Sequence, residues 1–124
     1  MKKILLVEDD PFLIDIYTRK LKKAGFEMVV AENGDEAQKL LQQKTFDLVV
    51  LDIVLPEIDG WAILKEIKAR KQKNKNLENL KIIILSNLGQ KEEVEKGLKL
   101  GATKYLIKAH YTPSQVVEEI KKIL

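Results

Sequence analysis

The sequence predicts an α/β fold in which a parallel sheet is covered by helices on both faces. Five short apolar segments alternate with five longer amphipathic segments along the 124 residues. The links between these segments are short, so each helix would return the chain across the sheet in a right-handed crossover. The apolar segments are continuous rather than alternating, as expected for strands that are buried on both faces.

The segments follow one another in a regular order. We expect strands at residues 2–8, 26–31, 46–52, 80–86 and 104–108, because each is a short apolar run. We expect helices at residues 9–25, 33–44, 59–71, 90–101 and 112–124. No internal repeat, low-complexity segment or second domain is visible, so residues 1–124 are predicted to form one domain, without an attached output module.

The first two helices carry clear boundary signals. Asp10 can cap the first helix, Pro11 suits its first turn and Gly25 suits its end. Asn33 and Glu36 have capping-box spacing at the start of the second helix. The face of the first helix that we expect to point inward consists of Leu13, Ile14, Tyr17, Leu21 and Ala24.

The later helices show similar signals. The fourth helix is expected to stop at Gly101. A cap signal opens the fifth helix, formed by Thr112, Pro113 and Gln115. The predicted inward positions are Trp61, Leu64 and Ile67 in the third helix, and Val116, Ile120 and Ile123 in the fifth.

Composition excludes several classes of function. Apolar residues make up 45% of the chain and charged residues 33%, which is typical of a soluble globular domain. The net charge of +3 is too small to indicate nucleic-acid binding. The most basic stretch, KARKQKNKNLENLK at residues 68–81, is interpreted as a solvated helix end and loop.

The rare residue types exclude further classes. The chain has no cysteine, so it has no disulfide, thiolate metal site or thiol nucleophile. His110 is its one histidine, which excludes a multi-histidine zinc site. The apolar run near the N-terminus is too short for a signal peptide or a membrane span. We therefore expect a cytoplasmic protein without membrane contact.

Polar residues interrupt or end four of the predicted strands. Glu8 and Asp9 end the first, Asp52 the third, Ser86 the fourth and Lys108 the fifth. Asp52 is the most unusual of them, because three apolar residues precede it and three follow it. In an open parallel sheet, ligands bind beyond the carboxyl ends of the strands. These side chains are therefore expected to meet at one edge of the sheet.

Their charges indicate a chemistry. Glu8, Asp9 and Asp52 would bring about three negative charges together, and such like charges disfavour full ionisation. A divalent cation that prefers oxygen ligands, Mg²⁺ or Mn²⁺, relieves this repulsion. Asp52 would then stay ionised and could act as a nucleophile that forms an aspartyl-phosphate. Lys108 would neutralise phosphoryl oxygens, and Ser86 would donate a hydrogen bond to one of them.

Four segments together resemble the receiver domain of two-component response regulators over essentially the whole chain. These segments are ILLVEDD, DLVVLDIVLPEIDG, IIILSN and GATKYLIKA. The resemblance implies a flavodoxin-like, doubly wound (βα)₅ fold with strand order 2-1-3-4-5. It also implies a stand-alone receiver that regulates a downstream protein or relays phosphate.

The resemblance assigns roles at the acidic edge. Asp52 would accept a phosphoryl group from a sensor histidine kinase or a histidine phosphotransfer protein. Glu8 and Asp9 would serve the metal site, with Asp9 the direct ligand, and the backbone carbonyl of Val54 would complete the protein ligands. The domain would phosphorylate itself in a metal-dependent reaction and lose the phosphoryl group slowly, without being an enzyme in the usual sense.

The resemblance also assigns a switch. Ser86 matches the hydroxyl residue that moves to the phosphoryl group, and Lys108 matches the family's lysine. Tyr105 matches an aromatic residue whose inward or outward pose reports the state; plain packing at the sheet edge is the alternative for it. Contacts made only with the phosphoryl group would then change the face formed by the fourth helix, fifth strand and fifth helix.

Two positions depart from the family pattern, and two others affect the expected lifetime of the phosphorylated state. The family commonly has proline after the lysine with a cis bond before it, but this chain has Ala109, so either a strained cis bond or a different loop is expected. Asn87 stands where a small residue is usual and would narrow access to the site. Val54 and Leu88 stand where polar residues help to place the hydrolytic water, so their apolar side chains predict a long-lived phosphorylated state.

Three other classes of protein share part of this pattern. A phosphatase of the haloacid-dehalogenase type needs a second aspartate two residues after the first, where this chain has Val54. A dinucleotide-binding domain needs a glycine-rich turn, but the sequence there is VEDDPF. A receiver-like domain that no longer takes phosphate is left open by Ala109 and Asn87. Phosphorylation by a small phosphodonor, compared with Asp52→Ala, separates these cases.

Overall fold

A computed structural model of the chain describes residues 1–124 apart from the side chain of residue 76. Five parallel strands form one sheet in the order β2-β1-β3-β4-β5. This confirms the predicted topology. The strands are β1 (Lys3–Val7), β2 (Glu27–Ala31), β3 (Leu48–Leu51), β4 (Lys81–Ser86) and β5 (Lys104–Ile107).

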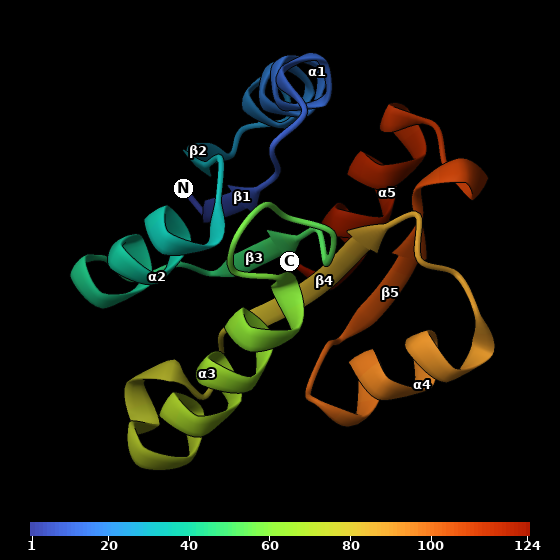
Figure 1. The fold of residues 1–124 in the computed structure, drawn as a ribbon. Coiled ribbons are helices and arrows are strands. Elements are labelled where there is room, and N and C mark those ends of the chain that lie inside the picture. The colour runs from blue at the N-terminus through green and yellow to red at the C-terminus, as the bar shows by residue number, and fades with distance from the viewer.

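Five α-helices cover the two faces of the sheet (Figure 1). They are α1 (Pro11–Lys23), α2 (Gly34–Gln43), α3 (Gly60–Lys73), α4 (Lys91–Lys99) and α5 (Pro113–Ile123). Two short 3-10 turns, η1 (Lys75–Leu77) and η2 (Lys108–His110), precede β4 and follow β5. Helices α1 and α5 lie on one face of the sheet and α2, α3 and α4 on the other (Figure 1).

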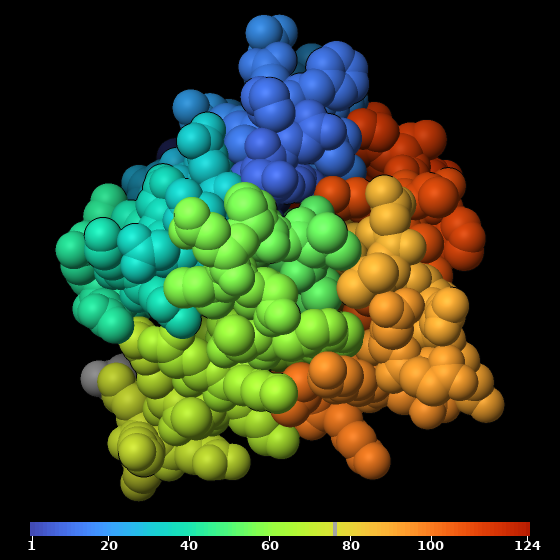
Figure 2. Space-filling model, viewed as in Figure 1, coloured from blue at the N-terminus to red at the C-terminus, as the bar shows by residue number. Residues whose placement is uncertain are grey.

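Each face has its own apolar core, as the continuous apolar strands predict. The core under α1 and α5 contains Tyr17, Leu21, Val116 and Ile120. The two helices also contact each other, as the blue and red surfaces in Figure 2 show, and the Lys20 ammonium donates to the Ser114 hydroxyl at 3.0 Å. The other core contains Ala37, Ile63, Leu64 and Ile67 from the helices.

Burial differs between the middle and the edges of the sheet. Strands β1, β3 and β4 are almost entirely buried, but β2 and β5 are only partly buried. The expectation of strands buried on both faces is therefore wrong for these two, because an edge strand has one neighbour instead of two. Among the helix residues predicted to point inward, five are also half-buried rather than fully inside: Leu13, Ile14, Ala24, Trp61 and Ile123.

The predicted helix boundaries are largely confirmed. The Asp10 side chain accepts hydrogen bonds from the backbone of Phe12 and Leu13, and Thr112 and Gln115 form a full capping box. Asn33 caps α2 by accepting from the backbone N–H of Glu36 at 2.8 Å. Gly25 and Gly101 follow helices α1 and α4 with φ values of 99° and 107°. These boundaries place the strand-to-helix loops that carry the polar residues.

Candidate functional site

The polar residues predicted at the strand ends lie at the carboxyl edge of the sheet. Glu8 follows β1 directly and Asp52 follows β3. The hydrogen-bond ladder continues through both residues, because Glu8 N–H donates to the Ala31 carbonyl and Asp52 N–H donates to the Val7 carbonyl, each at 3.0 Å. Backbone pairing of neighbouring strands therefore holds these two carboxylates side by side.

Lys108 joins the two buried carboxylates. Its Nζ lies 2.7 Å from Asp52 Oδ2 and 2.6 Å from Glu8 Oε1. The exposed fractions of the side chains are 13% for Lys108, 6% for Asp52 and 2% for Glu8. Hydrogen bonds between charged groups that are withdrawn from water are much stronger than those on an open surface. The ammonium is thus fixed between the two acids.

Burial and charge shift the pKa values of these groups. Burial raises the pKa of Glu8, the Lys108 ammonium lowers it, and the Asp52 charge raises it again, with a net increase. Burial alone would lower the pKa of Lys108, but hydrogen bonds to Asp52 and Glu8 outweigh that effect and raise it. Lys108 therefore remains a cation over the whole physiological pH range.

Asp9 adds a third carboxylate at the rim. Glu8, Asp9 and Asp52 each offer one oxygen, and these oxygens all lie within 4.8 Å of one another. Glu8 and Asp52 are buried, whereas Asp9 is exposed, so one side of the group is open to water. Three carboxylates against one ammonium leave an excess of negative charge. An all-oxygen set that is open on one side suits Mg²⁺, which keeps several of its waters.

The loop after β3 positions Asp52 from the other side. The backbone N–H of Val54 donates to Asp52 Oδ1 at 3.0 Å, while Oδ2 accepts from Lys108. Both carboxylate oxygens are therefore held in place. The Val54 side chain is 56% exposed beside them. Val54 therefore adds an exposed apolar side chain two residues after Asp52.

Gly60 was not predicted as a site residue, although it helps to shape this loop. A Cβ at Gly60 would lie 2.5 Å from the Asp52 carbonyl oxygen and 2.6 Å from the Ile53 Cα. Its N–H also donates to the Ile53 carbonyl at 2.8 Å. Only glycine lets the start of α3 approach the backbone behind Asp52 this closely. In the sequence, Asp59 and Gly60 were predicted only to begin the third helix.

Ser86 and Tyr105 meet at the backbone of Leu88. The buried Ser86 hydroxyl accepts from the Leu88 N–H at 3.3 Å, and the Tyr105 hydroxyl donates to the Leu88 carbonyl. The Tyr105 ring is half-buried against the core and against Gly97 of α4, where a Cβ would lie 2.8 Å from the ring. The predicted hydroxyl and aromatic residues are thus connected through the backbone of one residue, Leu88, and Gly97 provides the space for the ring.

The loop after Lys108 takes a different course from the one that a cis bond would give. The described part of the chain contains no cis peptide bond. Residues Lys108–His110 instead form the turn η2, and Lys108 still reaches both carboxylates. Of the two expectations for Ala109, the different loop is therefore correct. Asn87 is exposed.

The environment of Tyr105 gives a testable pH dependence. Burial, with the negative charges of Glu93 and Asp52, raises the pKa of Tyr105 from 10.0 to about 12. A pKa that is higher in the folded state stabilises the fold fully below pH 10.0, and this contribution is lost as the pH rises from 10.0 to about 12. A Tyr17→Phe/Tyr111→Phe variant keeps one of the three tyrosines, so tyrosinate absorbance should report Tyr105 alone. A midpoint of the absorbance titration near pH 10 would contradict the half-buried position of the Tyr105 ring.

Comparisons with known proteins give a consistent result. The family model described as the response regulator receiver domain matches residues 4–121. The alkaline phosphatase synthesis transcriptional regulatory protein PhoP of Bacillus subtilis is 34% identical over 125 residues, which cover 99% of this chain and 48% of PhoP. The transcriptional regulatory protein CusR of Escherichia coli is 38% identical over 106 residues, which cover 86% of this chain and 44% of CusR. This chain spans about half the length of these curated relatives.

Solved structures share the whole architecture. The chemotaxis response regulator CheY4 of Vibrio cholerae superposes with a TM-score of 0.87 at 26% identity, covering 100% of this chain and 99% of CheY4. The response regulator TrrA of Thermotoga maritima, in complex with Mg²⁺-BeF, superposes with a TM-score of 0.83 at 32% identity, covering 100% of both chains. Among the described helices of the present chain, none combines the length and apolar character needed to cross a bilayer.

Proposed function

The chain belongs to the response regulator receiver domain family, and on this premise we propose that it is a switch that accepts a phosphoryl group on Asp52. Receiver domains are signalling modules rather than enzymes in the usual sense. The observation that carries the proposal is the contact of one ammonium, Lys108, with Asp52 and Glu8, beside the exposed carboxylate of Asp9.

The transfer step follows from this geometry. A carboxylate oxygen of Asp52 attacks the phosphorus of a phosphohistidine on a sensor histidine kinase or a histidine phosphotransfer protein. The P–O bond forms as the P–N bond breaks, and the leaving imidazole recovers its electron pair and takes a proton. Bound Mg²⁺, held by Asp9, Asp52, Glu8 and the Val54 carbonyl, would neutralise charge on the phosphoryl oxygens. The Lys108 ammonium neutralises charge from the other side.

The switch uses groups already in contact. The phosphoryl group offers new acceptor oxygens, and the Ser86 hydroxyl turns to donate to one of them. Ser86 then no longer accepts from the Leu88 N–H, and the carbonyl of the same residue accepts from the Tyr105 hydroxyl. The change is passed to the face of α4, β5 and α5. A preference of a few kcal/mol between two states is enough to shift their populations substantially.

The partners follow from the chemistry and from the relatives. The phosphodonor is a phosphohistidine protein, and the downstream partner is a protein that recognises the changed face or receives the phosphoryl group in a relay. PhoP and CusR are named as transcriptional regulators, and the present chain covers about half of the length of each. We propose a cytoplasmic location, without direct contact to nucleic acid through this domain.

The proposal is tested by removing the metal. Incubation with acetyl phosphate and Mg²⁺ should add one phosphoryl group, seen in the intact mass of the protein, because the cation offsets the repulsion between donor and acidic site. Mn²⁺ should substitute, and EDTA should suppress the reaction. Equal phosphorylation in EDTA would contradict the role of the carboxylate cluster. Lack of phosphorylation with either metal would favour a receiver-like domain that does not take phosphate.

The lifetime of the phosphorylated state is a separate prediction. Val54 borders Asp52 with an exposed apolar side chain, and Leu88 is half-buried beside Ser86. Neither side chain can orient a water for hydrolysis, so we expect the phosphoryl group to persist for many minutes in Mg²⁺. Val54→Asn and Leu88→Glu should each shorten this lifetime, measured by loss of the phosphorylated mass. Decay of the parent within seconds, or unchanged decay in both variants, would show that these positions do not control hydrolysis.

A further inference from the structure

We propose that a basic hollow at the opposite edge of the sheet is a binding site for a small phosphate-bearing molecule. The basic hollow lies between the C-terminal ends of α2 and α3 and has a volume of about 680 Å³. Its cationic side chains are Lys3, Lys44, Arg70 and Lys73. It is separate from the phosphoacceptor site, because Lys3 begins β1 whereas Glu8 follows its end.

The fold assembles this hollow from distant parts of the chain. Lys3 comes from the first strand, Lys44 from the cap of α2, and Arg70 and Lys73 from the last turn of α3. Helices α2 and α3 contact each other and lie side by side (Figure 1). The basic stretch at residues 68–81 therefore does not simply end in solvent. Its cations join two others around a concave space.

The charges around the hollow favour an anion. No carboxylate is among its lining residues in the described part of the chain. Arg70 is held in place by Glu66, so its guanidinium is oriented in advance, and Lys3 pairs with Glu27 at 3.3 Å. Lys44 and Lys73 have no ion pair among the described residues. The amides of the neighbouring residues Gln42, Gln43 and Asn74 add polar groups along the lining.

Helix stabilisation alone accounts for only part of this arrangement. Cations near a helix C-terminus interact favourably with the helix dipole. This effect explains why Lys44, Arg70 and Lys73 each occur where they do. It does not explain Lys3, which lies in a strand. Glu66 and Glu27 offset Arg70 and Lys3, and the two helix ends carry about −0.5 charge each. Among the lining residues an excess of about one positive charge therefore remains, which Lys44 and Lys73 supply. The Asp47 carboxylate, which is outside the lining, accepts from the Lys3 backbone N–H at 2.7 Å.

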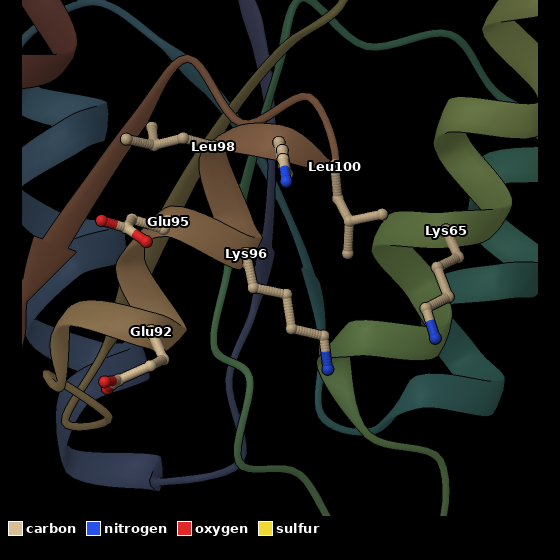
Figure 3. Close-up of a pocket in the computed structure, with 7 residues that line it drawn as sticks. Lys65, Glu92, Glu95, Lys96, Leu98 and Leu100 are labelled. Carbon is tan, nitrogen blue, oxygen red and sulfur yellow. The ribbon is translucent and has the colours of Figure 1, made fainter.

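A second cavity provides a contrast. A space of about 640 Å³ between α3 and α4 is lined by Lys65, Lys96 and Lys99, but also by Glu92 and Glu95. Figure 3 shows Lys65 and Lys96 reaching into the space between the helices, with both glutamates on α4. Its charges are thus mixed, and it serves as a control site of similar size.

Size and shape narrow the ligand class. Pockets of about 300–1,000 Å³ usually take molecules the size of a drug or a nucleotide, so 680 Å³ exceeds what inorganic phosphate would fill. A concave space between two helix ends suits a compact molecule better than a long nucleic-acid backbone, which tracks a stripe or groove. We infer a nucleoside polyphosphate or a molecule of similar size and charge.

The test is a calorimetric titration of the full chain with ATP. It is done in EDTA, so that no cation can attract phosphate to the acidic site. ATP should bind more tightly than inorganic phosphate, and added salt should weaken binding. A Lys44→Gln/Lys73→Gln variant should bind ATP at least tenfold more weakly, whereas Lys65→Gln/Lys99→Gln at the second cavity should bind as the parent does. Asp52→Ala should also bind as the parent does, which keeps this test independent of phosphorylation.

Three outcomes would overturn the proposal. The first is that neither ATP nor tripolyphosphate binds to the parent. The second is an equal loss in both double variants, which would indicate general attraction to surface lysines. The third is that a single-stranded oligonucleotide binds more tightly than ATP and depends on Lys44 and Lys73, which would identify a nucleic-acid surface instead.

Discussion

Replacing Asp52 with alanine is expected to abolish phosphorylation of this protein by acetyl phosphate in Mg²⁺. The two oxygens of the Asp52 carboxylate are held in place by the Val54 N–H and by Lys108. Glu8 is more deeply buried, with its oxygens bound by Lys108 and by the backbone N–H groups of Asp9 and Asp10, and Asp9 is exposed, so we expect neither to replace Asp52 as the nucleophile. Intact mass and a phosphopeptide map are the measurements.

The fold of this variant should survive, which makes the result interpretable. Lys108 keeps its contact with Glu8 at 2.6 Å when Asp52 is removed, so no unpaired ammonium is left behind. Asp35→Ala is a matched control, because Asp35 is an exposed aspartate whose one ion pair among the described residues is with Lys39 on the same helix. Asp35→Ala should be phosphorylated like the parent. Phosphorylation of Asp52→Ala to a similar extent would show that the acceptor is another residue.

Much of this site could be predicted because strand ends are visible in the sequence. An ionisable residue directly after an apolar run, as at Asp52, is expected at the carboxyl edge of a parallel sheet. The five apolar runs therefore predicted a parallel sheet, and the polar residues at four of their ends predicted that Glu8, Asp9, Asp52 and Lys108 meet at one edge. The strand order came from the resemblance to receiver domains. The sequence could not show the hydrogen bonds that hold Asp52 Oδ1 or that connect Ser86 with Tyr105, because these bonds depend on the conformation of the backbone in the loops.

Other features depend on packing that no periodic pattern reports. Gly60 and Gly97 matter through the atoms that lie against their missing side chains, Asp52 in one case and Tyr105 in the other. The partial exposure of β2 and β5 follows from their place at the edges, whereas their sequences resemble those of the central strands. The basic hollow likewise combines residues 3, 44, 70 and 73, whose proximity depends on the way α2 and α3 pack.

Replacing Lys108 with methionine is expected to destabilise the fold by on the order of 3 kcal/mol at neutral pH, since it leaves two buried carboxylates without their cation. Methionine keeps most of the side-chain volume, so the effect is mainly electrostatic. Because the Lys108 charge lowers the pKa of Glu8, its removal should raise that pKa further. The raised pKa of Glu8 does not change the free energy of unfolding below pH 4.5, the ordinary pKa of this group. The destabilisation grows as the pH rises above that value.

Urea unfolding at several pH values, with and without Mg²⁺, measures this effect. The difference in free energy of unfolding between Lys108→Met and the parent should be smallest at acid pH and should shrink when Mg²⁺ is added, because the metal replaces the missing positive charge. Lys91→Met is the control, since the Lys91 side chain is 84% exposed and its ion pair with Glu95 contributes little. A pH-independent loss that Mg²⁺ leaves unchanged would mean that Lys108 acts through packing rather than charge.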